Sequence, residues 1–291
     1  MTHSARETER ETSMKNTVFP LLTENEQHLP YYVFSIGLDH IQEHILRKNG
    51  YPCYQWIQCR SGAGRLIVDG NEYQICKDQG ALLLPGEAHE YYGDSSDDWV
   101  VDWIGLSGSG ISEFFEKTAK MTRTFVYNVA QPDDIRDAME QIMAAAQSPN
   151  PIKTMDVSAL AYNFLMNLLK HASTSNSNSV SSRYNRLTPV LNYIEEHYAE
   201  AITLKELSEL LGVTPQHLCT LFRKIMNTRI FEYINLVRIK KSKEFLLDQP
   251  GTAIRDVAHT NGFEDVSYFC YIFKRIEKTT PGDFRKLYVR T

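Results

Sequence analysis

The sequence has few cysteines, and none of them form a pair at metal-binding spacing. Its five cysteines are scattered over 291 residues without a Cys-x-x-Cys motif. An odd, unclustered set argues against a disulfide scaffold and against structural zinc, so no metal or other cofactor is expected. Because free thiols are typical of a reducing compartment, we expect the protein in the cytoplasm.

Long apolar runs are also absent. No stretch approaches the roughly eighteen consecutive apolar residues that mark a membrane-spanning helix. Residues 1–17 are polar and charged, and they lack the apolar segment of a secretory signal. We therefore expect a disordered tail over residues 1–17 and no contact with a membrane.

The chain lacks the overall positive charge that is common in nucleic-acid-binding proteins. Its net charge is −5 at pH 7. From Arg183 onward, however, 17 lysine and arginine residues oppose 13 aspartate and glutamate residues, which gives +4, and the part before Arg183 carries −9. The basic residues thus gather in the C-terminal part, where phosphate contacts would need them.

A tract rich in serine and asparagine divides the chain. Residues 172–182 contain Ser-Thr-Ser-Asn-Ser-Asn-Ser, which cannot bury enough apolar surface to become ordered. We expect a flexible linker over 172–182, a first domain over 18–171 and a second domain over 183–291. A chain of this length is long enough to form two domains, each with its own hydrophobic core.

Short strand-like segments fill residues 31–106. Aromatic and β-branched runs such as 54–59 and 100–104 alternate with turn signals such as Asp69-Gly70. This spacing predicts an all-β barrel or sandwich. Two amphipathic helices are predicted to follow, over residues 133–147 and 155–170. Their apolar stripes are compatible with packing on the barrel and with a dimer interface, and the sequence leaves both open.

The C-terminal part contains an internal repeat. Leu204–Lys224 and Ile254–Arg275 each place apolar residues on two short helices, with Gly212 or Gly262 between them. Glycine ends a helix readily because it adopts the left-handed conformation at little steric cost. One such helical hairpin would be unremarkable, but two copies in register predict two helix-turn-helix units.

The second helix of each repeat is the candidate recognition helix. Thr214 and Asp265 stand where each of these helices should be capped. Helix-turn-helix units present the outward face of this helix to the major groove of DNA. The outward residues are Gln216, Cys219, Thr220 and Arg223 in the first copy, and Ser267, Cys270, Tyr271 and Lys274 in the second.

Motifs over residues 202–288 resemble the AraC/XylS family of transcription regulators. They include Leu218-x-x-Leu-Phe-Arg-Lys224, Val257-Ala-x-x-x-Gly-Phe263 and Thr280-Pro-Gly-Asp-Phe-Arg285. Two positions depart from the family pattern, since Asn227 replaces a usual glycine and Ser242 replaces a usual alanine.

This resemblance implies a partner and a binding mode. Two recognition helices, held by a helix over Phe231–Leu247, would enter successive major grooves of double-stranded DNA, roughly 34 Å apart. The base-contacting residues would be Gln216, Cys219, Thr220, Ser267, Cys270 and Tyr271. The phosphate-contacting residues would be Arg223, Lys224, Lys274 and Arg275. An activator of this family would also contact RNA polymerase.

The first domain resembles the cupin-like sensing domain of the arabinose-type branch. Gly80-Ala-Leu-Leu-Leu-Pro-Gly-Glu-x-His89-x-Tyr91 and Trp99-x-x-Asp-Trp103 carry this resemblance. It implies a small, sugar-like effector in the barrel and a homodimer formed through the adjacent helices. The implied effector-binding residues are Ser61, His89, Tyr91 and Trp103. Ser61 stands in place of the branch's arginine, and the two aromatic residues are equally compatible with barrel core.

A cupin-type metal enzyme is the rival interpretation of the barrel. Such a site needs about three imidazoles and a carboxylate on neighbouring strands. Only His89 lies on the predicted strands, so the chain is not predicted to be an enzyme. The predicted fold is α+β and multidomain, with a cupin-like β-barrel and two helices before an all-α domain. The predicted function is a ligand-controlled activator of carbohydrate-utilisation genes, with a constitutive regulator whose barrel only dimerises as the alternative.

Overall fold

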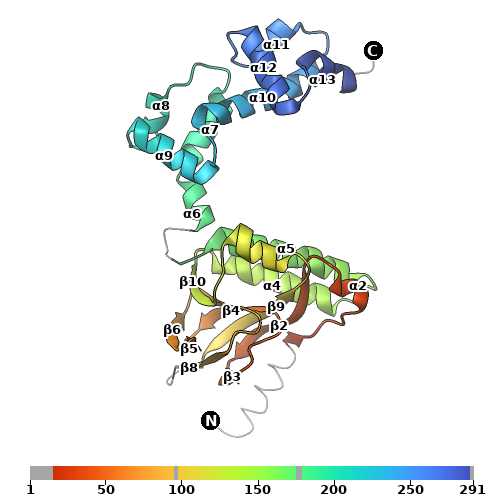
Figure 1. The fold of residues 1–291 in the computed structure, drawn as a ribbon, viewed down its shortest axis with the longest axis vertical. Helices are drawn as coiled ribbons and strands as arrows, with labels where there is room; N and C mark the ends of the chain where they lie inside the picture. The colour runs from red at the N-terminus through yellow and green to blue at the C-terminus, as the bar shows by residue number, and fades with distance from the viewer. Residues whose placement is uncertain (1–15, 95–97, 175–178, 289–291) are drawn as a thin grey trace. The chain divides into compact units, whose positions relative to one another are not determined.

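The structure is a computed structural model that describes residues 16–94, 98–174 and 179–288. The chain forms two compact domains, over residues 1–182 and 183–291 (Figure 1). Most of the tail expected at residues 1–17 lies outside the described residues. Thr17 itself pairs with Gly37 and belongs to the short strand β1 (Thr17–Val18).

Two antiparallel sheets face each other in the N-terminal domain. In the larger sheet the order is β1-β2-β9-β4-β7-β10-β11, and in the smaller sheet it is β3-β8-β5-β6. After β1, the larger sheet contains β2 (Tyr32–Ile41), β4 (Tyr54–Ser61), β7 (Gln79–Leu83), β9 (Val100–Ser107), β10 (Phe125–Val129) and β11 (Ala172–Ser173). The smaller sheet contains β3 (Ile45–Arg47), β5 (Ala63–Val68), β6 (Asn71–Cys76) and β8 (His89–Gly93).

Alternation along the strands sorts the N-terminal domain into two cores. On β4, Ile57 and Cys59 belong to the core between the two sheets, whereas Trp56 belongs to the core on the other face. Successive side chains of a strand point to opposite faces, so one strand supplies both cores. Tyr91 and Trp99 are the largest fully buried side chains between the sheets.

Two long helices, α4 (Pro132–Gln147) and α5 (Lys153–His171), cover the outer face of the larger sheet (Figure 1). They share an apolar core with the sheet, to which they contribute Ile135, Met139, Phe164 and Leu165. Both helices agree with the predicted ranges, and the α+β fold class is confirmed. The shorter helical segments of this domain are α2 (Glu24–Gln27), α3 (Ile111–Glu113) and the π-helical segment η1 (Phe114–Ala119).

The larger sheet contains strands outside residues 31–106, the range over which the sequence pattern predicts strands. Strand β10 pairs with β7, and β11 pairs with β10. Strand β11 lies at the start of the predicted linker over 172–182, and helix α6 (Val180–Asn185) begins near its end. Residues 175–178 of that tract lie outside the described residues.

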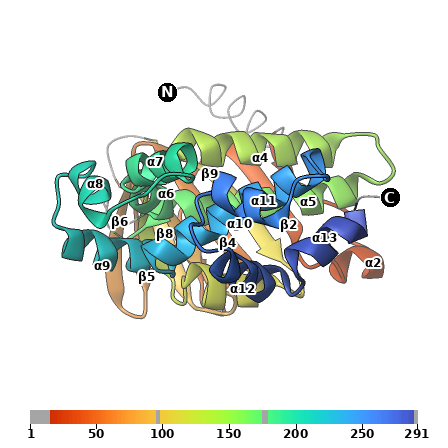
Figure 2. The same ribbon diagram turned by 90° about the horizontal axis from the view of Figure 1, so that it is seen from above.

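The C-terminal domain is helical and contains two apolar cores. Its helices are α7 (Thr188–His197), α8 (Leu204–Glu209), α9 (Pro215–Met226), α10 (Ile230–Asp248), α11 (Ile254–Thr260), α12 (Val266–Glu277) and α13 (Pro281–Tyr288). Helix α10 runs between α9 and α12 in both views (Figures 1 and 2). Val237 of α10 belongs to the first core and Ile239 to the second, so one helix connects the two.

Candidate nucleic-acid interface and effector site

The first helix-turn-helix unit consists of α8, a turn and α9. The carboxylate of Glu206 accepts hydrogen bonds from the backbone and hydroxyl of Thr203, and these bonds lower the pKa of Glu206. Gly212 adopts the predicted left-handed backbone, with φ 61°. Thr214 caps α9, since its hydroxyl accepts a hydrogen bond from the backbone N–H of His217 at 3.2 Å. The starts of both helices are therefore fixed by local bonds.

The second unit repeats this construction with α11 and α12. Gly262 is left-handed, with φ 81°. The carboxylate of Asp265 accepts a hydrogen bond from the backbone N–H of Tyr268 at 2.6 Å and caps α12. The predicted caps at Thr214 and Asp265 are thus confirmed, and each recognition helix has a defined start.

Each recognition helix buries one face and exposes the other. The buried side chains are Leu218 and Phe222 on α9, and Phe269, Ile272 and Phe273 on α12. Of the predicted base-contacting residues, the structure exposes Gln216, Cys219, Thr220, Ser267 and Tyr271 and half-buries Cys270. The predicted phosphate-contacting residues Arg223, Lys224, Lys274 and Arg275 are also exposed.

The exposed faces of α9 and α12 are positively charged. Helix α9 contains no acidic residue. Glu277 is the acidic residue of α12, and its carboxylate pairs with the ammonium of Lys243 at 3.0 Å. No carboxylate on either helix is therefore left to repel a phosphate backbone, which suits a DNA-facing surface.

Local bonds restrict what two of the exposed side chains can offer. The hydroxyl of Thr220 donates a hydrogen bond to the carbonyl of Gln216 at 3.0 Å, which leaves its methyl group as the main contact. The guanidinium of Arg275 lies 5.8 Å from the ring centroid of Tyr271. Arg275 is thus partly held in place before any DNA arrives.

The two departures from the family pattern have physical explanations. Asn227 ends α9 in the left-handed conformation, with φ 52°, which asparagine tolerates better than most residues. Ser242 is fully buried on α10, and its hydroxyl donates to the carbonyl of Arg238 at 2.7 Å. Burying a hydroxyl group that keeps such a hydrogen bond lowers the stability of the fold only slightly.

Two predicted effector-binding residues lie on β8 and point between the sheets. His89 is 3% exposed, and its Nδ1 lies 2.8 Å from the carbonyl oxygen of Glu87. Burial lowers the pKa of His89, so the ring is neutral at pH 7, with Nδ1 as the donor and Nε2 as an acceptor that faces Arg47. The ring of Tyr91 stacks on that of His89 with centroids 5.8 Å apart.

The other two predicted residues lie on the larger sheet. Trp103 of β9 is half-buried and packs against the core between the sheets, 6.4 Å from the ring of His40. Ser61 is exposed at the end of β4. The structure therefore brings His89, Tyr91 and Trp103 to the core between the sheets, whereas Ser61 faces solvent.

The strand pattern does not find a polar group that lies beside His89. Arg47 of β3 donates a hydrogen bond to the side-chain oxygen of Gln55 at 2.7 Å, and its Nη1 lies 3.5 Å from Nε2 of His89. Its guanidinium lies 4.2 Å from the ring centroid of Tyr51. An arginine that ends the apolar run Ile45-Leu-Arg47 is the signal that could have indicated it.

Arg60, the arginine next to Ser61, points to the opposite face of the larger sheet. Its Nε lies 3.4 Å from the carboxylate of Asp102, which is fully buried. Arg136 of α4 reaches the same carboxylate at 2.7 Å and that of Asp39 at 2.8 Å. The hydrogen bond from Arg136 lowers the pKa of Asp39, whereas burial raises that of Asp102. This charge cluster joins α4 to the sheet and leaves Arg60 outside the barrel.

A metal site, a reactive cysteine and a membrane-spanning helix each require features that can be sought among the described residues. No group of three or more histidine, cysteine, aspartate or glutamate side chains gathers there as metal ligands would. Burial raises the pKa of Cys53 to about 12 and that of Cys59 to about 11, so neither is a thiolate at neutral pH. No described helix is long and apolar enough to span a membrane.

Comparison with known families identifies the class of protein that this fold and these surfaces define. Residues 31–165 match the AraC-like ligand binding domain, and residues 207–287 match a helix-turn-helix domain. The protein is a DNA-binding transcription regulator, and the chain belongs to the AraC family.

Relatives of similar length are also regulators. The chain is 26% identical to the Msm operon regulatory protein of Streptococcus mutans, over 77% of this chain and 81% of the relative. It is 25% identical to the HTH-type transcriptional regulator YisR of Bacillus subtilis, over 89% and 92% of the two chains. It is 21% identical to the raffinose operon transcriptional regulatory protein RafR of Pediococcus pentosaceus, over 78% and 82%.

Proposed function

We propose that this regulator activates carbohydrate-utilisation genes in response to a sugar-like effector, and that each monomer contacts two unlike DNA half-sites. The observation that carries the DNA part is the pair of exposed faces on α9 and α12, which present basic residues and no unpaired carboxylate. The names of two relatives, regulators of the Msm and raffinose operons, support the carbohydrate part.

The proposed DNA contacts follow from the chemistry of each face. The amide of Gln216 can pair with both N6 and N7 of an adenine, and the methyl group of Thr220 can contact a thymine methyl. Ser267 and Tyr271 occupy the corresponding places on α12, so the second half-site should differ from the first. The basic side chains at the C-terminal ends of both helices, Arg223, Lys224, Lys274 and Arg275, would contact phosphates.

The proposed effector site lies between the two sheets. A sugar offers C–H faces for aromatic rings and hydroxyl groups for polar partners. Tyr91 and Trp103 supply rings there, the neutral His89 supplies an acceptor, and Arg47 supplies donors. Ser61 could join only from the exposed end of β4.

A homodimer through α5 completes the proposal. Ile152, Met155 and Tyr162, at the start and on the outer side of this helix, are 57%, 63% and 46% exposed. Apolar side chains grouped on one helix face are typical of a protein interface. A dimer held in this way would place two C-terminal domains on one promoter, where an activator would contact RNA polymerase.

A ligand screen tests the effector part directly. Binding to the folded state raises stability by about 2.7 kcal/mol when the ligand is at a hundred times its Kd. We expect one or more mono- or disaccharides at millimolar concentration to raise the melting temperature, and we expect Tyr91→Ala to abolish this rise. If no sugar stabilises the protein, the barrel does not sense sugars, and the constitutive regulator is favoured.

A further inference from the structure

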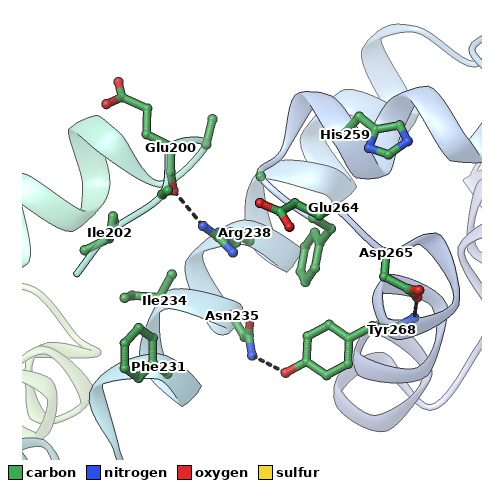
Figure 3. Close-up of a pocket in the computed structure, with 14 residues that line it drawn as sticks. Glu200, Ile202, Phe231, Ile234, Asn235, Arg238, His259, Glu264, Asp265 and Tyr268 are labelled. Carbon is green, nitrogen blue, oxygen red and sulfur yellow. Dashed lines mark hydrogen bonds between the residues drawn. The ribbon is translucent and has the colours of Figure 1, made fainter. Parts of the chain in front are cut away.

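The two apolar cores of the C-terminal domain are separate, and a cleft lies beside the stretch of α10 that connects them. The first core ends at Val237 of α10, and the second begins at Ile239. A cleft of about 620 Å³ lies beside α10, between the segment after α7 and the second unit (Figure 3). Since apolar packing does not continue across it, polar contacts along α10 must set the angle between the units.

Arg238, which lies between those two core residues, contacts the segment after α7 on one side and the second unit on the other. Its Nη2 donates to the carbonyl of Glu200 at 2.8 Å (Figure 3), and its Nε donates to the carbonyl of Tyr198 at 2.7 Å. These carbonyls follow the end of α7, where helix carbonyls lack partners within the helix. On the other side, its guanidinium lies 5.7 Å from the ring centroid of Phe263 in the second unit.

The backbone of the second unit closely approaches the segment after α7 beside Arg238. A Cβ atom on Gly262 would lie 2.8 Å from the carbonyl oxygen of Tyr198 and 2.9 Å from that of Ala199. It would also lie 2.9 Å from Nε of Arg238. The turn before α12 thus contacts the segment after α7, and Arg238 lies beside this contact.

Four polar side chains of the cleft, those of Asn235, Arg238, Asp265 and Tyr268, already have hydrogen-bond partners. The side-chain amide of Asn235 donates to the hydroxyl of Tyr268 at 3.1 Å, which ties α12 to α10. Asp265 is engaged in capping α12, and Arg238 is engaged with the two carbonyls. A ligand would have to break these bonds, so the cleft is better explained as a joint than as a binding site.

We propose that Arg238 is a positioning residue that fixes the distance between α9 and α12, and thereby the spacing of the half-sites that one monomer accepts. This inference rests on the proposed role of α9 and α12 as recognition helices. One added base pair moves a half-site by about 3.4 Å and rotates it by about 34°. A rigid joint cannot follow that displacement, whereas a loosened joint can.

A spacing series tests the DNA consequence. The wild-type protein first selects its site from randomised duplexes, and the half-sites are then moved apart or together by one and two base pairs. Arg238→Met keeps the side-chain length but removes every donor. We expect it to bind the selected spacing about ten- to a hundredfold more weakly, as the loss of hydrogen bonds from a charged group predicts. The affinity of Arg238→Met should fall less than that of the wild type when the spacing is altered. Arg238→Lys should show an intermediate loss of affinity and an intermediate spacing preference.

Lys240→Ala is the matched control. Lys240 lies on the same helix, and its ammonium approaches the carboxylate of Glu195 on α7 at 4.0 Å. Lys240→Ala removes one positive charge from α10, as Arg238→Met does. We expect it to keep the spacing preference of the wild type. On isolated half-sites the affinities of Arg238→Met and Lys240→Ala should agree within about twofold. A loss on half-sites as large as the loss on the whole site would overturn the inference, because it would indicate general damage.

A measurement without DNA separates this inference from the proposed function. Each recognition helix carries one cysteine, Cys219 on α9 and Cys270 on α12. Spin labels there, with Cys76 replaced by serine and with Cys53 and Cys59 protected by burial, report the distance between the helices. We expect a narrow distribution in the wild type and in Lys240→Ala, and a broad one in Arg238→Met. An unchanged width overturns the inference, even if the protein binds DNA as proposed. A wild type without spacing preference contradicts the proposed function, and the width still decides the role of Arg238.

Discussion

Two side chains on each recognition helix carry the difference between the proposed half-sites. Gln216 and Thr220 on α9 correspond to Ser267 and Tyr271 on α12, and all four are exposed. A glutamine amide offers a donor and an acceptor to one base, whereas serine offers a single hydroxyl. The two helices therefore present different chemistry on nearly identical scaffolds.

Replacing Gln216 by alanine tests a base contact. We expect Gln216→Ala to weaken binding to the selected site by about 1–3 kcal/mol, because a bidentate contact to a base is lost. Binding to random duplex should hardly change. Fluorescence anisotropy titrations at one salt concentration compare the two duplexes, and equal losses on both would show that Gln216 does not contact a base.

Replacing Lys274 by alanine tests a phosphate contact. We expect Lys274→Ala to lower the affinity for all duplexes alike and to reduce the slope of log K against log salt by about one unit. Titrations over a range of salt concentrations give that slope. If the slope of the variant is as steep as that of the wild type, Lys274 does not contact a phosphate.

Sequence patterns locate single residues only where the cause is local. The hydroxyl of Thr214 bonds to a backbone N–H only three residues away, so the cap could be predicted from the sequence. Arg238 bonds to the carbonyl of Tyr198, forty residues earlier, and Arg47 lies beside His89, forty-two residues later. These contacts depend on how helices and strands pair in space, which periodicity along one element does not show.

At the scale of secondary-structure elements, a charge cluster attaches α4 to the sheet. Arg136 is 15% exposed and bridges Asp39 and the fully buried Asp102. We expect Arg136→Met to lower the free energy of unfolding by about 3–5 kcal/mol, because it leaves the Asp102 carboxylate buried with a weaker partner. Denaturant titration monitored by tryptophan fluorescence measures this loss.

Arg65→Met provides the control for that substitution. Arg65 forms ion pairs with Glu72 and Asp94, but its side chain is 41% exposed. We expect a change below about 1 kcal/mol there, since exposed pairs contribute little. If both variants lose the same stability, burial of the Arg136 cluster has no special role.

Two buried histidines, His89 and His171, and the half-buried His40 give the N-terminal domain a pH dependence. Burial lowers the pKa of His40, His89 and His171 below the usual 6.5. The unfolded chain therefore takes up protons near pH 6.5 while the folded domain still excludes them, and stability falls as the pH drops below 6.5. Thermal unfolding between pH 7.5 and 5.5 should show this fall, and His89→Asn should show a shallower one. A stability that rises on acidification through this range would contradict the assignment of the buried histidines as neutral.

The elements themselves follow the sequence where their periodicity is strong. The helical stripes of α4 and α5 and the aromatic and β-branched runs of β4 and β9 predict the helices and the strands of the N-terminal domain. Strand β10 contains the β-branched and aromatic run Phe125-Val-Tyr-Asn-Val129, a local signal that was available. Strand β11 has only two residues, so no periodicity could reveal it, and its pairing with β10 depends on tertiary structure.

At the scale of the whole molecule, one chain combines a ligand-binding domain of AraC type with two helix-turn-helix units. The two units share a scaffold, caps and a left-handed glycine, but their exposed faces differ. A monomer should therefore contact an asymmetric target that has a direction on the promoter. A dimer through α5 would contact two such targets.

In vitro selection from a randomised duplex library tests the central proposal most directly. We predict that the selected sequences contain two unlike motifs, in a fixed order, with centres about one helical turn or 10 base pairs apart. Gln216→Ala should change the preference in one motif, and Ser267→Ala should change it in the other. Recovery of a single motif, or of two identical motifs at that spacing, would contradict the proposal that α9 and α12 contact different bases.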